Sequence, residues 1–200
     1  MIYRPDVSST RVVNYKYDSE GRLIQIDTED TTKPLIKINY LNTDQIGRIE
    51  LPSNAMSFDY NYTGNSPLPN SIYITQNSHH ATADVTFIDG NLNFKTFDID
   101  RTLTAVNTTD RSFKSIIDGL SSFQIIYDPN KKNGLGDQKA LNIPIALTGY
   151  VEFLYILQLN TQVIKDIQLS NGNSQPLEFE YDTEGYITKT KDGKIEYFYQ

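Results

Sequence analysis

The chain has 200 residues, of which 38% are hydrophobic and 22% are charged, and this composition is typical of a folded globular protein rather than a disordered one. Its net charge of −7 argues against nucleic-acid binding as a main task, because phosphate contacts need clustered Lys and Arg. The chain has no Cys, which excludes disulfides, zinc thiolate sites and cysteine nucleophiles.

The aromatic content favours β structure. There are 14 Tyr and 9 Phe but no Trp, and Tyr and Phe pack well on the pleated, half-buried surface of a strand. A chain of this length suits one domain. We therefore expect a single domain over residues 1–200, with residues 1–11 as a candidate N-terminal linker.

The first predicted element is a hairpin over residues 12–26. Apolar and polar residues alternate up to Tyr17, which is the pattern of a strand with one buried face. The stretch "DSEG" then predicts a turn. Asp18 can accept hydrogen bonds from backbone amides, and Gly21 can adopt a positive φ at little steric cost. The chain returns through Leu23.

A near-copy of this hairpin stands close to the C-terminus. "FEYDTEGYITKT" over residues 179–190 repeats the pattern of "YKYDSEGRLIQI" over residues 15–26. A second turn at residues 191–194 leads into "IEYFYQ", so we expect a three-stranded meander. The residues that recur in the turn are Tyr181, Asp182 and Gly185.

Looser copies lie between the two, over residues 37–51, 57–74 and 83–97. The first of them keeps Tyr40 before the turn and Gly47, which we place in a turn lengthened by extra residues. The shared unit is a strand ending in Tyr, an acidic or Gly-containing turn, and a strand beginning with an aliphatic residue. Reuse of one unit predicts an antiparallel sheet built from hairpins.

Two segments interrupt this rhythm. Apolar residues at helical spacing favour a short helix near residues 110–120, although a strand fits as well. A second helix near residues 145–157, opened by Pro144, competes with a strand alternation in the same stretch. The apolar run over residues 143–159 is shorter than the ~20 residues of a membrane-spanning helix and contains Glu152, so we expect buried core and no transmembrane segment.

The predicted fold is mainly β: a single antiparallel, strongly twisted meander sheet of about ten strands, forming an open or half-barrel, with one or two short helices. The N-terminal and C-terminal hairpins then lie either at opposite edges or close on one another.

No motif predicts catalysis. His79 and His80 are adjacent, so on a strand they would face opposite sides, and we interpret them as a polar loop joining two strands rather than a metal site. "DPNKKNGLGD" fails the calcium-loop pattern, since Lys132 stands where an oxygen ligand is needed. The carboxylate pairs lie in or near turns, and we found no nucleophile elbow. We therefore expect no catalytic residues, no metal site, no cofactor and no enzymatic activity.

The turn "YDSEGRL" resembles the YD repeat of Rhs-type toxins and teneurins. Its matching positions are Tyr17, Asp18, Gly21, Arg22 and Leu23. In the C-terminal copy Tyr186 and Ile187 replace the Arg and the Leu of that pattern.

In its whole layout the chain resembles a family of Bacteroides-like bacteria catalogued as domain of unknown function 4595. The shared segments are YD-like hairpins, then "YDPNKKN", an apolar stretch, "TQVIKDI" and "FEYDTEGYITK". The resemblance implies a small envelope lipoprotein, exported and anchored through an N-terminal Cys. This chain shows neither a signal nor that Cys, which we attribute to trimming. The family brings no known catalytic residues.

These observations lead to one functional expectation and one alternative. We expect a non-enzymatic binding or scaffolding protein of the cell envelope, located in the periplasm or at the outer membrane. Its partners would be a glycan, a peptide or an envelope protein, because exposed Tyr rings can stack on sugars or line a peptide groove. The alternative is a carrier that encloses an apolar, lipid-like ligand inside the curved sheet. No individual ligand-binding residue is predicted.

Overall fold

The computed structural model describes residues 2–6, 9–28, 34–42, 44–96, 99–109, 111–132, 138–148, 162–169, 171–176, 178–191 and 195–196. The protein is mainly β, with 60% strand and one large antiparallel meander sheet that is not closed into a barrel. The predicted fold class is therefore confirmed. Within the described residues there is one α-helix, so the lower of the two predicted helix numbers is correct.

The elements follow one another along the chain with short connections. The strands are β1 (Ile2–Asp6), β2 (Ser9–Tyr17), β3 (Leu23–Thr28), β4 (Ile36–Asn42), β5 (Gln45–Leu51), β6 (Met56–Asn61), β7 (Ser71–Gln76), β8 (His79–Ile88), β9 (Asn91–Lys95), β10 (Asp100–Thr104), β11 (Ser115–Asp118), β12 (Ser121–Lys132), β13 (Gln162–Leu169), β14 (Ser174–Pro176), β15 (Phe179–Tyr181), β16 (Ile187–Thr190) and β17 (Ile195–Glu196). The helices are the 3₁₀ turn η1 (Pro52–Asn54) and α1 (Lys139–Thr148).

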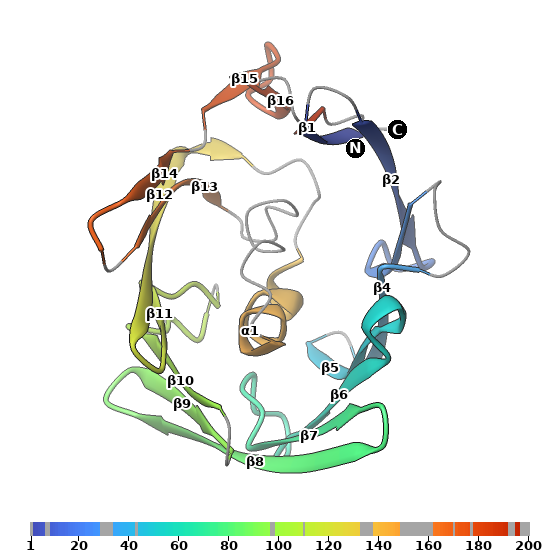
Figure 1. The fold of residues 1–200 in the computed structure, drawn as a ribbon, viewed down its shortest axis with the longest axis vertical. Coiled ribbons are helices and arrows are strands. Elements are labelled where there is room, and N and C mark those ends of the chain that lie inside the picture. Colours follow the sequence, from blue (N-terminus) through green and yellow to red (C-terminus); the bar gives the residue numbers. More distant parts are fainter. Residues whose placement is uncertain are drawn as a thin grey trace.

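From β2 to β14 each strand pairs antiparallel with the next, and the sheet curves into a ring around α1 (Figure 1). A second series of pairings runs from β15 through β16, β17 and β1 to β2. This series brings the N-terminal and C-terminal hairpins to neighbouring parts of the sheet, which is the second of the two arrangements left open by the sequence.

Apolar alternation explains which face of the sheet is buried. In β4 the inward residues Ile36 and Ile38 are buried while Lys37 is exposed, and β7 repeats the pattern with Ile72 and Ile74 around Tyr73. The inward side chains of the strands join the residues of α1 in one apolar core. Since strand residues face alternate sides, one apolar residue in two is enough to build this core.

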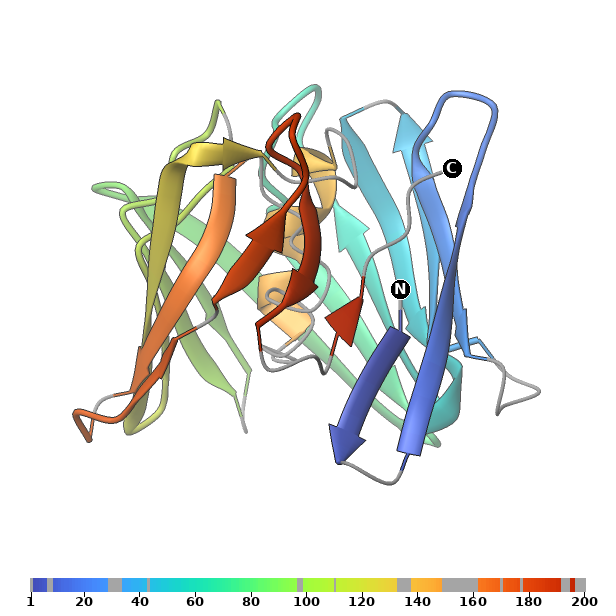
Figure 2. The same ribbon diagram turned by 90° about the horizontal axis from the view of Figure 1, so that it is seen from above.

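Both YD turns lie at the same end of the ring. Because every pairing from β2 to β13 is antiparallel, the even-numbered strands run in one direction. Four antiparallel steps connect β15 to β2, so β15 also runs in that direction. We call the end at which β2, β4, β6, β8, β10, β12 and β15 finish the YD end; it is the upper side in Figure 2. The opposite end carries the other turns.

Helix α1 stands inside the ring, and its residues from Ala140 to Thr148 are all buried (Figures 1 and 2). A helix that is apolar on every side needs apolar neighbours on every side, and the curved sheet supplies them. The prediction that Pro144 opens the helix was wrong: α1 begins at Lys139 and contains Pro144. The part of the predicted helix beyond Thr148 lies outside the described residues.

Polar side chains from the sheet bond to the backbone of α1. Arg101 of β10 donates from Nη1 to the carbonyl of Leu147 at 2.7 Å, and its guanidinium also pairs with Asp118. Tyr60 of β6 donates from its hydroxyl to the carbonyl of Pro144 at 2.9 Å. The Leu147 carbonyl lies in the last turn, where no intrahelical partner exists, and the negative end of the helix dipole favours a cation there. Arg101 therefore both satisfies and neutralises the C-terminus of α1.

The predicted helix near residues 110–120 was wrong. Residues Ser115–Asp118 form β11, which pairs with β10 and β12, and Gly119 takes a positive φ of 57° in the turn that follows. The apolar residues that fitted a helical face do not share one, since Ile116 is buried while Leu120 is fully exposed. Backbone pairing on both sides of β11 outweighs the local helical pattern.

Residues 1–11, expected as a linker, contain β1 and the beginning of β2 instead. β1 pairs with β2 on one side and with β17 on the other. The strand is held by partners far away in sequence, which a local pattern does not reveal. Within the described residues no helix is long and apolar enough to span a membrane.

Replacing Arg101 with Met should lower the free energy of unfolding by about 2–4 kcal/mol, because the change leaves the Leu147 carbonyl without its buried donor and Asp118 without its cation. Chemical denaturation measures this loss. The matched control is Lys95→Met, since Lys95 makes an exposed ion pair with Asp100 that should contribute less than about 1 kcal/mol. Equal effects of the two changes would contradict the anchoring role of Arg101.

Candidate functional site

The predicted turn residues fall into two groups at the YD end. Tyr17 ends β2, and Asp18 and Gly21 lie in the turn between β2 and β3. Tyr181 ends β15, and the C-terminal turn contains Asp182 and Gly185. Tyr40 lies near the end of β4, where it contacts the first of these turns.

Gly47 does not lie in a turn. It belongs to β5, which begins at Gln45, so the connection from β4 is shorter than the sequence suggested. A Cβ at Gly47 would approach the side chain of Leu41 to 3.0 Å. Close approach of Leu41, rather than turn geometry, is therefore the reason for glycine at this position.

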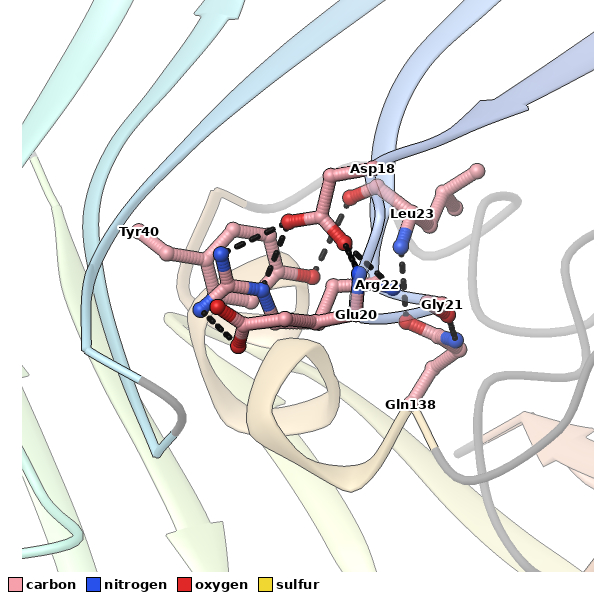
Figure 3. Close-up of polar contacts among 7 residues, drawn as sticks. All are labelled: Asp18, Glu20, Gly21, Arg22, Leu23, Tyr40 and Gln138. Carbon is pink, nitrogen blue, oxygen red and sulfur yellow. Dashed lines mark hydrogen bonds and ion pairs between the residues drawn. The ribbon is translucent and has the colours of Figure 1, made fainter.

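The Asp18 carboxylate organises the first turn (Figure 3). Its Oδ1 accepts hydrogen bonds from the backbone amides of Glu20 at 2.9 Å and Arg22 at 3.0 Å. Two backbone bonds close the turn: the Asp18 amide donates to the Arg22 carbonyl, and the Gly21 amide donates to the Asp18 carbonyl. Gly21 has a φ of 75°, which favours glycine. The predicted roles of Asp18 and Gly21 are confirmed.

The second turn repeats this geometry. Asp182 Oδ1 accepts from the amides of Glu184 and Tyr186, both at 2.9 Å, and Gly185 has a φ of 88°. The backbone bonds of the first turn recur between the corresponding residues. The repeated sequence thus encodes a repeated set of hydrogen bonds.

Arg22 distinguishes the first turn from the second. Its Nε and Nη2 both lie 2.7 Å from Asp18 Oδ2, and its Nη1 lies 3.1 Å from Glu20 Oε2. The guanidinium also sits 4.7 Å from the centre of the Tyr40 ring, within cation–π range. The Tyr40 hydroxyl donates to the Leu23 carbonyl at 3.1 Å. Arg22 and Tyr40 together fasten the first turn to β4.

Gln138, the residue before α1, joins the same turn to the helix. Its Oε1 accepts from the Leu23 amide and its Nε2 donates to the Gly21 carbonyl, both at 3.0 Å (Figure 3). Gln138 is only 4% exposed. We call the residues of this network the YD clasp. They are Asp18, Glu20, Gly21, Arg22, Leu23, Tyr40 and Gln138.

Two pKa values in the clasp are displaced. Hydrogen bonding, above all from the Arg22 amide, holds the pKa of the Asp18 carboxyl below its usual value, against an opposing effect of burial. Burial raises the pKa of the Tyr40 phenol well above its ordinary value. Asp18 therefore stays ionised and Tyr40 stays protonated near neutral pH, which are the states that their hydrogen bonds require.

The clasp holds chain segments together rather than presenting a reactive group. Both Asp18 oxygens accept hydrogen bonds, and the three guanidinium nitrogens of Arg22 all face a carboxylate. A general acid or base needs a free proton-transfer site within reach of a substrate. The arrangement of the clasp instead fixes the end of β2 and β3 against β4 and α1.

The second turn has a different attachment. Lys131 of β12 places Nζ 4.2 Å from the centre of the Tyr181 ring, and the Phe179 ring makes an edge contact with Tyr181 at 6.5 Å. Burial raises the pKa of the Tyr181 phenol. The Lys131 contact connects β12 with β15, two strands that belong to different series of pairings.

His79 and His80 do not form a loop; they begin β8. The His80 ring stacks against Tyr73 of β7, with 5.7 Å between ring centres, and its Nδ1 lies 3.2 Å from Thr75 Oγ1. The tight turn before β8 leaves both His in the ladder with β7, which is why the loop interpretation was wrong. Within the described residues, no group of three or more His, Cys, Asp or Glu is placed to hold a metal ion.

The sequence did not point to the polar residues around α1. Gln138, Tyr60 and Arg101 bond to atoms 46 to 117 positions away in the chain. Asn142 was the one detectable signal, as a single amide in the apolar stretch "ALNIPIAL"; its Nδ2 donates to the Arg111 carbonyl at 2.6 Å. Buried polar residues of this kind need partners.

Compared with known proteins, the chain matches no family model and no curated sequence. The resemblance to YD repeats and to the envelope family consequently rests on the motifs quoted above.

Stability should depend on the ionisation of Asp18. Because its folded pKa is lowered, its stabilisation is fully present above the ordinary carboxyl value of about 4 and is lost as the pH falls through the folded pKa. The difference in unfolding free energy between the wild-type protein and Asp18→Asn should thus be largest near pH 7 and shrink below about pH 3. Denaturation curves at both pH values measure it. A difference that is the same at both would contradict the role of the carboxylate.

Replacing Gln138 with Ala should lower the free energy of unfolding by about 2 kcal/mol, because it leaves the Leu23 amide and the Gly21 carbonyl without a buried partner. The control is Gln168→Ala on the exposed side of β13, which should change stability by less than about 0.5 kcal/mol. Urea denaturation compares the two. An effect of Gln138→Ala no larger than that of the control would show that the clasp does not hold α1.

Proposed function

We propose that the protein is a non-enzymatic binding or scaffolding protein of the cell envelope that presents a rigid curved sheet to a glycan, a peptide or an envelope protein. The observation that carries this proposal is the position of α1. The helix is buried inside the ring and is bonded to β10, to β6 and to the YD clasp. The surfaces that remain for a partner are the turns and the outer face of the sheet.

The interior supports surface binding over the carrier alternative. A carrier needs space between the inward faces of its strands for an apolar ligand. Here the inward side chains, such as Phe58 and Phe94, belong to the same buried core as Leu141 and Ile145 of α1. The protein's own helix therefore occupies the position that a carried lipid would take.

The use of the carboxylates supports a non-enzymatic role. Asp18 and Asp182 each accept hydrogen bonds from two turn amides. On the outer face Arg48 lies between Glu50 and Asp59, in a row of paired charges. Hydrolysis of a glycoside needs instead two carboxylates that face each other across a cleft.

The location in the envelope is supported by the family resemblance alone. Its expected consequences are export of the natural protein and recovery with the periplasm or the outer membrane. The absence of a spanning helix among the described residues is consistent with a partner-binding protein attached by other means.

Native mass spectrometry of the protein purified from the envelope fraction of its own cells tests the proposal. We expect the protein in that fraction, with the mass of the polypeptide and no bound lipid, because α1 fills the ring. A lipid-sized addition that disappears on denaturation would support the carrier. Recovery in the cytoplasmic fraction alone would contradict the envelope assignment.

A further inference from the structure

We propose that the YD end of the ring is a docking surface for a protein segment that carries both basic and apolar side chains. This inference rests on the proposed binding function and names the partner's chemistry. Two properties of the YD end carry it: exposed apolar residues at the ends of its strands, and carboxylates in its turns.

Large apolar side chains are exposed where strands finish at the YD end. Tyr17 is 42% exposed at the end of β2, and Leu41 is 62% exposed near the end of β4. Phe87 and Ile88, the last two residues of β8, are 44% and 60% exposed. Consecutive strand residues face opposite sides of a sheet, so exposure of both shows that the end of β8 extends beyond the core.

These residues lie along one arc of the rim. Strands in a sheet are spaced about 4.8 Å apart, so Tyr17 and Leu41 are separated by two strand spacings. Between β4 and β8 the rim is formed by the loop from β6 to β7, in which Tyr62 and Pro67 are half-buried. Gln45 holds this loop by donating from Nε2 to the carbonyls of Gly64 and Ser66. The arc is therefore apolar at intervals and fixed in place.

The turns at the YD end are acidic. Among the turn residues that the structure describes, those at the opposite end contain no carboxylate, and near that end Asp100 and Asp118 pair with Lys95 and Arg101. The described acidic residues in the turns of the YD end are Asp18, Glu20, Asp44, Asp89, Asp182 and Glu184.

The cations near these carboxylates do not cancel the charge. Arg22 is shared between Asp18 and Glu20, and Arg111 is 4% exposed beneath Asp44, whose own side chain is 65% exposed. Asp89 and Glu184 are exposed. Complementary potentials steer and orient partners, so this rim selects a basic segment. The same charge repels anionic lipid surfaces and nucleic acids, which makes a protein segment the occupant.

The test uses two synthetic peptides as probes, one with alternating Leu and Lys and one with alternating Leu and Glu. We expect the Leu/Lys peptide to bind and the Leu/Glu peptide not to bind, as measured by fluorescence anisotropy of labelled peptide. Binding should weaken as salt is raised, because the Debye length is about 8 Å at physiological ionic strength.

Variants locate the surface. Replacing both Phe87 and Ile88 with Ser should weaken binding about tenfold, as expected for apolar anchors of an interface. The matched control is Leu120→Ser, a fully exposed Leu in a turn at the opposite end, which should bind like the wild-type protein. Asp89→Asn combined with Glu184→Gln should reduce the salt dependence. Thermal unfolding confirms that each variant is folded.

The outcomes separate this inference from the proposed function. Equal binding of both peptides, or an equal loss with Leu120→Ser, overturns the docking surface. Binding to phosphatidylglycerol vesicles that is lost with the Phe87 and Ile88 variant would assign the arc to membranes and also overturn it. If an envelope partner binds that variant unchanged, the surface is wrong while the proposed function stands; if neither the peptides nor any envelope component binds, both fail.

Discussion

The structure depends on one constraint: a helix that is apolar on every side must be enclosed, and the backbone groups at its ends must still find polar partners. The curved sheet encloses α1, and three side chains from distant parts of the chain reach its backbone or the residue beside it. Arg101 bonds to the Leu147 carbonyl, Tyr60 to the Pro144 carbonyl, and Gln138 leads from the helix to the first YD turn. A buried carbonyl left without such a donor costs about 1–3 kcal/mol, so these contacts are as important as the apolar packing.

The contacts also determine which parts of the ring are held together. Arg101 lies in β10 and Tyr60 in β6, while the clasp adds β2, β3 and β4. The helix thus connects strands that do not pair with one another. Such a sheet keeps its curvature without closing into a barrel, and its rim has a defined shape. A defined rim is what a binding or scaffolding role requires, because less ordering entropy is lost when a partner docks.

The hairpins were predictable because their causes are local. Alternation of apolar residues gives the strands, and an Asp followed three positions later by a Gly gives the YD turns, at Asp18 and again at Asp182. The errors share a different cause. Residues 115–118 form a strand because they pair on both sides, and Gly47 is small because Leu41 lies over it. The clasp and the anchors of α1 join residues far apart in sequence, so no local pattern predicts them.

Hydrogen exchange followed by mass spectrometry tests the central claim most directly, that α1 is an integral part of the folded ring. If it is, the amides of α1 should exchange only when β6 and β10 do, at a rate governed by the global free energy of unfolding. The slow exchange should extend to the clasp residues that bond to Gln138. Rapid exchange of α1 while the strands around it remain protected would contradict the claim, since the helix would then leave the ring without unfolding it.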